Sequence, residues 1–316
     1  MMSTPSDALS RFVTQLDPSS EVFAQVELRA PWGISETHLN SAYFSYVQEG
    51  ICIVEIDGQP PITVSSGQVV ILPYGHAHQI KSEQSVHCMP ADQIFSGKSV
   101  REIESMVIGG EGEQCLMLCG TFNFAPIQHW GEDSLIGSLP NLFVVDAPQN
   151  SRLAHLLLWL YQENNQRIAG QTLALDHLMH LLLLEMLRNL QQFNHNPSWM
   201  IALGNERLAP VILAIQEQYS KDWTVAELAD IAAMSRSVFS ERFKVLTGTT
   251  PLLFLRQWRC FIAAQFLANG NASIKRIAER VGFQSADVFI RNFKQFHRCT
   301  PKQYAQQYRL EIDEKS

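Results

Sequence analysis

The pattern of apolar and polar positions divides the chain into stretches of different character. Between about residues 20 and 145, short runs rich in Val, Ile, Tyr and Phe are separated by Gly and Pro. The clearest runs occupy residues 43–58, 61–73 and 114–124. Short apolar runs with this punctuation predict the strands of an antiparallel sandwich or barrel.

After these runs the period of the pattern changes from that of strands to that of helices. Residues 151–195 are strongly apolar and predict two helices, the first over residues 151–166 and a longer one over residues 171–193. The following residues 196–205 are more polar, with Gly and Asn, and are expected to form a linker.

The longer helix carries an unusually wide apolar surface. Leu178 and Leu182 lie on one stripe, and Leu183 and Leu187 widen it beyond what packing on one small sheet requires. We therefore expect residues 151–195 to form a dimerisation segment about a two-fold axis. Burial of the whole surface within one subunit is the alternative.

Residues 206–310 contain one helix-turn-helix pattern twice, about fifty residues apart. Thr224 begins the first copy as a helix N-cap, and Glu227 three residues later completes a capping box. Ser235 and Ser285 stand at the same place in the two copies and are expected to cap the second helix of each pair. Two helix-turn-helix units in tandem predict an all-α domain that places two helices in a DNA major groove.

The outward faces of these two helices are the candidate DNA-binding surface. With Val238, Phe239 and Phe243 facing the core, helical spacing brings the polar residues of the first unit together on the opposite face. The DNA-binding candidates of the two units are Arg236, Ser237, Ser240, Glu241, Lys244, Asp287, Ile290, Arg291 and Lys294. The alternative is that these are ordinary solvated faces of a helical domain.

Residues 205–310 resemble the DNA-binding domain of the AraC/XylS family of transcriptional regulators from end to end. The resemblance rests on the repeat, on the connecting helix PLLFLRQWRCFIAAQFLANG, and on GFQSADVFIRNFKQF followed by TPKQYAQQYR. Two residues depart from the family: Arg298 stands where glycine is usual, and Ala305 where arginine is common. These departures concern the end of the last helix.

The resemblance implies a sequence-specific transcriptional regulator, expected to be an activator and not an enzyme. The implied partners are a double-stranded DNA operator, RNA polymerase, a second copy of the chain as a homodimer, and an unknown small effector. A non-specific architectural DNA binder is a further interpretation.

The distribution of charge agrees with a DNA-binding C-terminal part. The whole chain has a net charge of −7, but residues 205–310 hold 15 Lys and Arg against 8 Asp and Glu. Residues 1–204 hold 8 against 20, so the acidic half should stay off the DNA and disfavours an architectural binder. The sequence shows no secretion signal and no run of eighteen apolar residues, so we expect a cytoplasmic protein without a membrane partner.

The first half has a spacing that resembles the second motif of cupin barrels. Gly67, Pro73, Gly75 and His78 follow the pattern G-x5-P-x-G-x-x-H. The resemblance implies a cupin-like sensor domain over residues 1–150. The expected fold is therefore α+β: a cupin-like β-barrel or sandwich, a helical dimerisation segment and the AraC-type domain over residues 206–310.

The alternative function from another class is a cupin metalloenzyme with a helical accessory domain. Metal-binding cupins take their ligands mainly from histidines, and this sequence supplies them only in part. His38, His76, His78 and Cys88 are the candidate metal ligands, so a bound metal ion in the sensor is one expectation for a cofactor. Asn40 occupies the place of another family histidine. The alternative is that His76 and His78 lie in a turn and form hydrogen bonds with neighbouring strands.

The cysteines offer a second interpretation of the sensor. Cys88 follows a histidine and is the candidate reactive thiol, because a neighbouring imidazolium favours the thiolate. Cys115 and Cys119 are further sensor candidates, but four residues along a strand separate them by about 13 Å, too far for a disulfide. An oxidant or a metal ion is therefore one class of signal, and a small metabolite in the barrel is the competitor.

Overall fold

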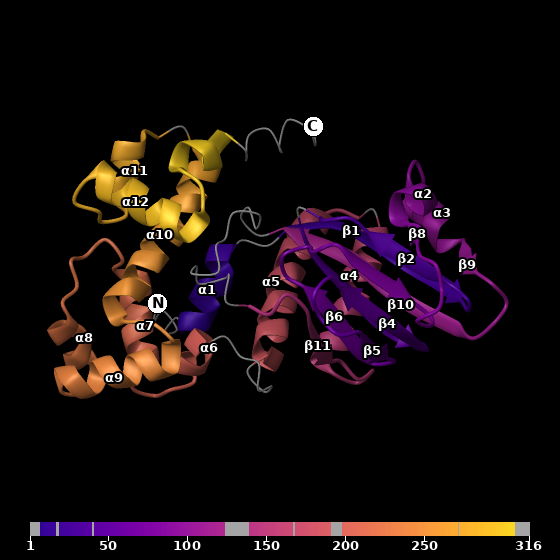
Figure 1. Ribbon diagram of the computed structural model, residues 1–316, viewed down its shortest axis with the longest axis horizontal. Helices are drawn as coiled ribbons and strands as arrows, with labels where there is room; N and C mark the ends of the chain where they lie inside the picture. Colours follow the sequence, from indigo (N-terminus) through magenta and orange to yellow (C-terminus); the bar gives the residue numbers. More distant parts are fainter. Residues whose placement is uncertain are drawn as a thin grey trace. The chain divides into compact units, whose positions relative to one another are not determined.

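The computed structural model describes residues 7–16, 19–39, 41–123, 139–166, 168–190, 198–270 and 272–306 (Figure 1). The chain separates into two compact units. The sheet unit contains residues 17–127 and 140–190, and the helical unit contains residues 1–16, 128–139 and 191–316.

Two mainly antiparallel sheets form the sheet unit. The first contains, in spatial order, β11 (Phe143–Asp146), β6 (Gln68–Leu72), β3 (Ala42–Glu49), β10 (Gln114–Asn123), β1 (Ser19–Arg29) and β9 (Val107–Gly109). The second contains β5 (Ile62–Ser65), β4 (Ile51–Ile56), β7 (His78–Lys81), β2 (Gly33–Glu36) and β8 (Met89–Pro90). Only β1 with β9 and β2 with β8 pair in parallel among the described strands. The expected cupin-like sandwich is confirmed.

Alternating residues of the strands form the core between the sheets. Val26 and Leu28 of β1 and Met117 of β10 lie in one buried cluster with Val54 of β4 and Ile80 of β7. Side chains two residues apart on a strand point to the same face. The apolar runs of the sequence therefore mark the strands, and their alternate residues fill the interior.

A tight glycine turn precedes β7. Gly75, between β6 and β7, has φ +61°, and an added Cβ would lie 2.3 Å from the carbonyl oxygen of Leu39. The backbone N–H of Leu39 donates to the carbonyl of Gly75 at 2.7 Å. Only glycine allows this approach, and the turn fixes the start of β7, where His78 lies.

Helices of the sheet unit cover the sandwich. They are α2 (Ala91–Phe95), α3 (Val100–Glu104), α4 (Arg152–Asn165) and α5 (Gln171–Leu190). Both α4 and α5 pack against each other and against β1. Leu183 and Leu187 are buried here, at 6% and 3% exposure, so they do not extend the exposed surface of α5 as the sequence predicted. The exposed apolar residues of α5 are Leu173 and Leu181.

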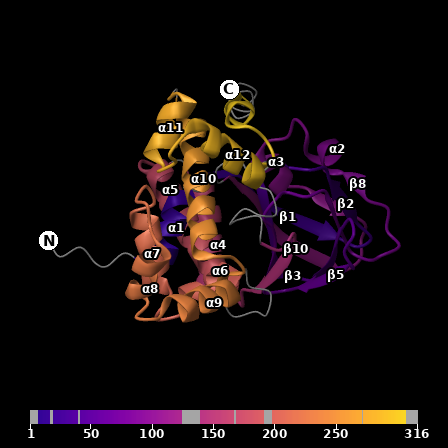
Figure 2. The ribbon, with the colours of Figure 1, turned by 60° about the vertical axis from the view of Figure 1, so that its left-hand side comes forward.

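The helical unit contains the repeated helix pairs. Its helices are α1 (Ala8–Leu16), α6 (Ser198–Leu203), α7 (Ala209–Glu217), α8 (Val225–Ile231), α9 (Arg236–Thr247), α10 (Pro251–Asn269), α11 (Ile274–Arg280) and α12 (Ala286–His297). The long helix α10 packs against α8, α9, α11 and α12 and runs between the two pairs (Figures 1 and 2). None of the helices in the described ranges is long and apolar enough to cross a membrane.

Helix α1 belongs to the helical unit, whereas residues 1–150 were all expected to lie in the sensor domain. The Phe12 ring lies 6.1 Å from that of Trp258 and 5.9 Å from that of Phe261, centroid to centroid. The side-chain amide of Gln265 donates to the carbonyl of Gln15. Helix α1 is amphipathic, so its apolar face needs a cover, and α7 and α10 provide one.

The predicted linker over residues 196–205 is also different in the structure. Residues 198–203 form α6, which packs against α9. Met200 and Ala202 are fully buried there. The polar residues around this segment suggested a linker, whereas the short apolar run inside it is part of the domain core.

Candidate functional site

Side-chain caps fix the start of each helix in the first helix pair. The Thr224 hydroxyl accepts from the backbone N–H of Glu227 at 3.2 Å, and the Glu227 carboxylate accepts from the N–H of Thr224 at 2.9 Å. The Ser235 hydroxyl accepts from the N–H of Val238 at the start of α9. The predicted capping box and the predicted cap of α9 are confirmed.

The second pair repeats this construction. The Ser273 hydroxyl accepts from the N–H of Arg276, and that of Ser285 from the N–H of Val288, both at 3.3 Å. The turn between the helices contains a left-handed residue in each copy: Ala233 with φ +50° and Gly282 with φ +89°. Both pairs are therefore helix-turn-helix units with the same backbone construction.

Phenylalanines hold α9 and α12 against the domain core. Phe239 and Phe243 of α9 are fully buried, as are Phe289 and Phe293 of α12. Val238 is 52% exposed, so the prediction that it faces the core is wrong. It lies one residue before Phe239, which turns it about 100° around the helix and toward the outward face.

The DNA-binding candidates are brought together on these outward faces. Seven of them are exposed, and Ser240 and Ile290 are half-buried. On α12 a hollow is lined by Asp287, Ile290, Arg291, Lys294 and the neighbouring Gln295. Asp287, Ile290, Arg291 and Lys294 follow the i, i+3, i+4 and i+7 spacing of one helix face.

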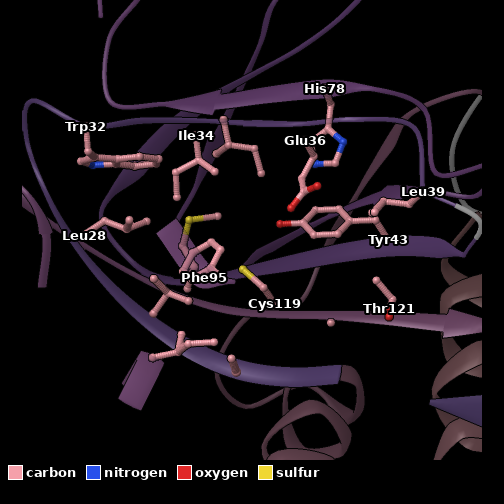
Figure 3. Close-up of a pocket in the computed structure, with 16 residues that line it drawn as sticks. Leu28, Trp32, Ile34, Glu36, Leu39, Tyr43, His78, Phe95, Cys119 and Thr121 are labelled. Atoms are coloured by element: carbon pink, nitrogen blue, oxygen red, sulfur yellow. The ribbon is translucent and has the colours of Figure 1, made fainter. Parts of the chain in front are cut away.

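A cavity of about 270 Å³ lies between the two sheets of the sheet unit (Figure 3). It is lined by Ala24, Val26, Leu28, Trp32, Ile34, Glu36, Leu39, Tyr43, His78, Ile80, Phe95, Ile103, Met117, Cys119, Gly120 and Thr121. Figure 3 shows Leu28, Trp32 and Phe95 toward one end and Glu36, Tyr43 and His78 toward the other. The cavity is thus apolar at one end and polar at the other.

The candidate metal ligands point in different directions. The rings of His38 and His76 lie 5.9 Å apart, whereas the His78 ring faces Tyr43 at 4.6 Å. Cys88 Sγ donates to the side chain of Gln79 on the second sheet. Within the ranges that the structure describes, no three His, Cys, Asp or Glu side chains are grouped so that they could hold a metal ion. The predicted metal set is therefore not assembled. Alternation along β7 turns His78 inward, whereas Gln79, the partner of Cys88, points outward.

Comparison with known proteins identifies the chain. A cupin family model matches residues 7–192, and a helix-turn-helix domain model matches residues 228–307. The transcriptional regulator AlkR of Acinetobacter baylyi is 28% identical, over 95% of this chain and 99% of its own length. The RCS-specific transcriptional activator RclR of Escherichia coli is 26% identical, over 96% and 98%. The chain is an AraC/XylS-family transcriptional regulator with a cupin-type sensor domain.

Among solved structures, the AraC/XylS-family chain is similar to ToxT from Vibrio cholerae. The two are 11% identical with a TM-score of 0.41, over 91% of this chain and 97% of ToxT. The expectation of a DNA-binding regulator with a cupin-like sensor is thus confirmed by the family matches and by the relatives.

The thiols of the regulator's sensor are not activated. Burial raises the pKa of Cys52 and of Cys88, and it raises that of Cys115 to about 12. Burial also raises the pKa of Cys119, in spite of hydrogen bonds with Ser45 and Tyr43 that lower it. The interpretation of Cys88 as a thiol activated by its neighbouring histidine is therefore not supported, because burial outweighs the nearby Lys81 charge that favours the thiolate.

The regulator's cavity residues were largely missed by sequence reasoning, although a signal for them exists. Four strands each contribute residues at alternate positions, such as Val26 and Leu28, Ile34 and Glu36, and Met117 with Cys119 and Thr121. This period of two marks the inward face of each strand. Of the predicted sensor residues, His78 and Cys119 line the cavity, whereas His38, His76, Cys88 and Cys115 do not.

Proposed function

We propose that this regulator binds its DNA operator through the outward faces of α9 and α12 and is controlled by a small effector in the sheet-unit cavity. The observation that carries the proposal is that two capped helix-turn-helix units occur in one chain with a cavity of about 270 Å³ between the two sheets of the sensor. Pockets lined mainly by apolar groups with a few convergent polar ones are typical ligand sites. The relatives are regulators, which supports a binding role rather than catalysis.

The DNA proposal assigns different roles to the two helices. Arg291 lies exposed on α12 beside Lys294, where a guanidinium can bind guanine or phosphate. Glu241 on α9 is exposed and is suited to accept from cytosine N4. Two such helices in successive major-groove segments lie about 34 Å apart, so one subunit should protect about twenty base pairs.

Replacement of Arg291 tests this placement. Arg291→Ala should weaken operator binding by about 1–3 kcal/mol, because it removes one base or phosphate contact. Arg207→Ala is the matched control, since Arg207 is exposed before α7 and outside both helix pairs. Binding is measured by fluorescence anisotropy on an operator first mapped by genomic footprinting. Equal losses in the two variants, or no loss in Arg291→Ala, would contradict the assignment.

We also propose that the regulator is a homodimer that activates transcription through RNA polymerase. RclR is named an activator, which supports this direction. The exposed Leu173 and Leu181 of α5 are eight residues apart, about two helical turns, and form an apolar surface that a second copy would cover.

Sedimentation of the full chain tests the dimer. Leu181→Asp should yield a folded monomer at micromolar concentration, whereas Leu183→Asp should unfold the sheet unit, because Leu183 is buried within it. A Leu181→Asp protein that stays dimeric would place the interface elsewhere.

A further inference from the structure

The polar end of the sensor cavity has a free hydrogen-bond acceptor. His78 is 4% exposed, and its Nδ1 lies 2.9 Å from the carbonyl oxygen of His76. A carbonyl only accepts, so Nδ1 carries the hydrogen of this bond. Burial lowers the pKa of His78, so the ring is neutral and Nε2 is left as an acceptor. Nε2 is buried and has no hydrogen-bond partner among the residues that the structure describes.

The charges of the cavity wall restrict what can bind there. Among the lining residues that the structure describes, Glu36 is the only carboxylate, and none is Lys or Arg. The buried Lys81 follows His78 by three residues on β7, so its side chain points to the opposite face, where it donates to Glu55 at 2.8 Å. Burial raises the pKa of Glu36. Among the described lining residues, an anionic ligand would therefore contact the carboxyl group of Glu36 and no positively charged side chain.

Two other polar groups of the cavity, the thiol of Cys119 and the hydroxyl of Tyr43, already have partners inside the protein. Cys119 Sγ lies 3.2 Å from the Ser45 hydroxyl and also bonds with Tyr43. Apart from Gly120 and Thr121, the other lining residues have aliphatic and aromatic side chains, among them Trp32 and Phe95 (Figure 3). A ligand would therefore bury an apolar body and direct a donor group toward His78.

We propose that the effector is an uncharged amphiphile with an apolar body and a terminal hydrogen-bond donor, a hydroxyl or an N–H, that His78 Nε2 accepts. The volume of about 270 Å³ lies just below the range of about 300–1,000 Å³ that is typical of ligand pockets, which suits a small compound of about ten non-hydrogen atoms. This inference rests on the proposed role of the cavity as the effector site. It names the chemistry of the ligand and excludes carboxylic acids in their ionised form.

Four probes, each with ten non-hydrogen atoms, test the proposal on the full-length protein. They are 1-nonanol, 1-methoxyoctane, octanoate and nonylammonium, and their affinities are measured by isothermal titration calorimetry. 1-Nonanol should bind about fivefold more tightly than 1-methoxyoctane, which lacks the donor. Octanoate should bind at least about tenfold more weakly than 1-nonanol, because its charge is buried beside Glu36.

Two variants locate the effect at the polar end. His78→Leu should abolish the difference between 1-nonanol and 1-methoxyoctane, with the melting temperature measured alongside to show that the protein is folded. Glu36→Gln should strengthen octanoate binding severalfold and thereby reduce the difference in affinity between octanoate and 1-nonanol. Glu83→Gln is the matched control, since Glu83 is exposed in the loop after β7 and should change neither affinity.

The outcomes separate this inference from the function on which it rests. Tighter binding of octanoate or of nonylammonium than of 1-nonanol would overturn the uncharged class while leaving the cavity as a ligand site. Equal binding of 1-nonanol and 1-methoxyoctane would overturn the role of His78. Failure of all four probes to bind would remove the cavity as the effector site, and this inference with it.

Discussion

The first helix pair turns at Ala233 and its second helix ends at Gly248, whereas the second pair turns at Gly282 and ends at Arg298. All four residues have φ values between +50° and +89°. Each copy therefore places one glycine and one larger residue at the two left-handed positions of the same backbone. The glycine is in the turn of one copy and at the helix end of the other.

The surroundings of the two turns explain in part why the second turn has glycine and the first has alanine. An added Cβ on Gly282 would lie 2.6 Å from the carbonyl oxygen of Ser220 and 2.9 Å from Nη2 of Arg259. Arg259 is itself buried and donates to the carbonyl of Lys221 at 2.8 Å, which holds this loop in place. Ala233 is exposed, so a methyl group has room there. The repeat thus conserves a backbone shape, and the neighbours decide which side chain each position accepts.

The largest expected effects test whether the two helix-turn-helix units have equivalent cores. Phe289→Ala and Phe239→Ala should each lower the free energy of unfolding of the helical unit by about 3–5 kcal/mol, because both rings are fully buried. Urea unfolding followed by circular dichroism measures the change. Val238→Ala is the control and should have little effect, since Val238 is exposed. Markedly unequal losses at Phe239 and Phe289 would mean that the two cores are not equivalent.

The turn residues should respond in opposite directions. Gly282→Ala should cost about 1–3 kcal/mol through its left-handed backbone, with a further cost from the collision with Ser220. Ala233→Gly should instead stabilise by about 0.5–1 kcal/mol, since the strain it relieves exceeds the entropic cost of glycine. Thermal melts of both variants test the pair. A stabilising Gly282→Ala would show that the surroundings of the second turn can relax.

The smallest expected effect is a difference between the two copies in how the stabilisation by the helix cap depends on pH. Hydrogen bonds with Thr224 and the nearby Lys221 lower the pKa of Glu227 to about 2 in the folded protein. A depressed folded pKa means that this contribution is full above the unfolded value of about 4.5 and is lost as the pH falls toward 2. The second copy has Arg276 at the corresponding place and lacks this carboxylate.

Thr224→Ala measures this difference between the caps. It should cost about 1 kcal/mol near pH 7 and less as the pH falls below about 4.5. Ser273→Ala should cost a similar amount that is independent of pH over the same window. Identical pH profiles of the two variants would contradict the role of Glu227.

Local pattern was sufficient for the helical repeat. The caps at Thr224, Ser235 and Ser285 and the buried Phe239 and Phe289 follow from residues close to one another in sequence. Val238 was wrongly assigned to the core because it lies at the edge of the apolar stripe, where the pattern alone does not tell whether a side chain is buried or exposed. The six-residue α6 was missed because so short a helix gives almost no periodic signal.

Long-range packing decided the features that the sequence left open. Leu183 and Leu187 are buried, and α5 packs against α4 and the first sheet, but the width of an apolar stripe does not tell whether its cover belongs to the same chain. The metal set failed for a related reason, since ligands must converge in space and spacing along a strand does not bring them together. The cavity could be found only when both sheets were in place.

The sequence by itself determined that a strand region is followed by two apolar helices and two helix-turn-helix units, and it determined the membership of the AraC/XylS family, because caps, turns and helical periodicity act over a few residues. Only the tertiary structure decided that α1 packs on α10, that Glu36 and His78 line one end of a cavity between the sheets, and that Cys52 and Cys115 are buried. These features depend on distances between residues far apart in the chain and on the exclusion of water between packed surfaces, and neither is written in local pattern.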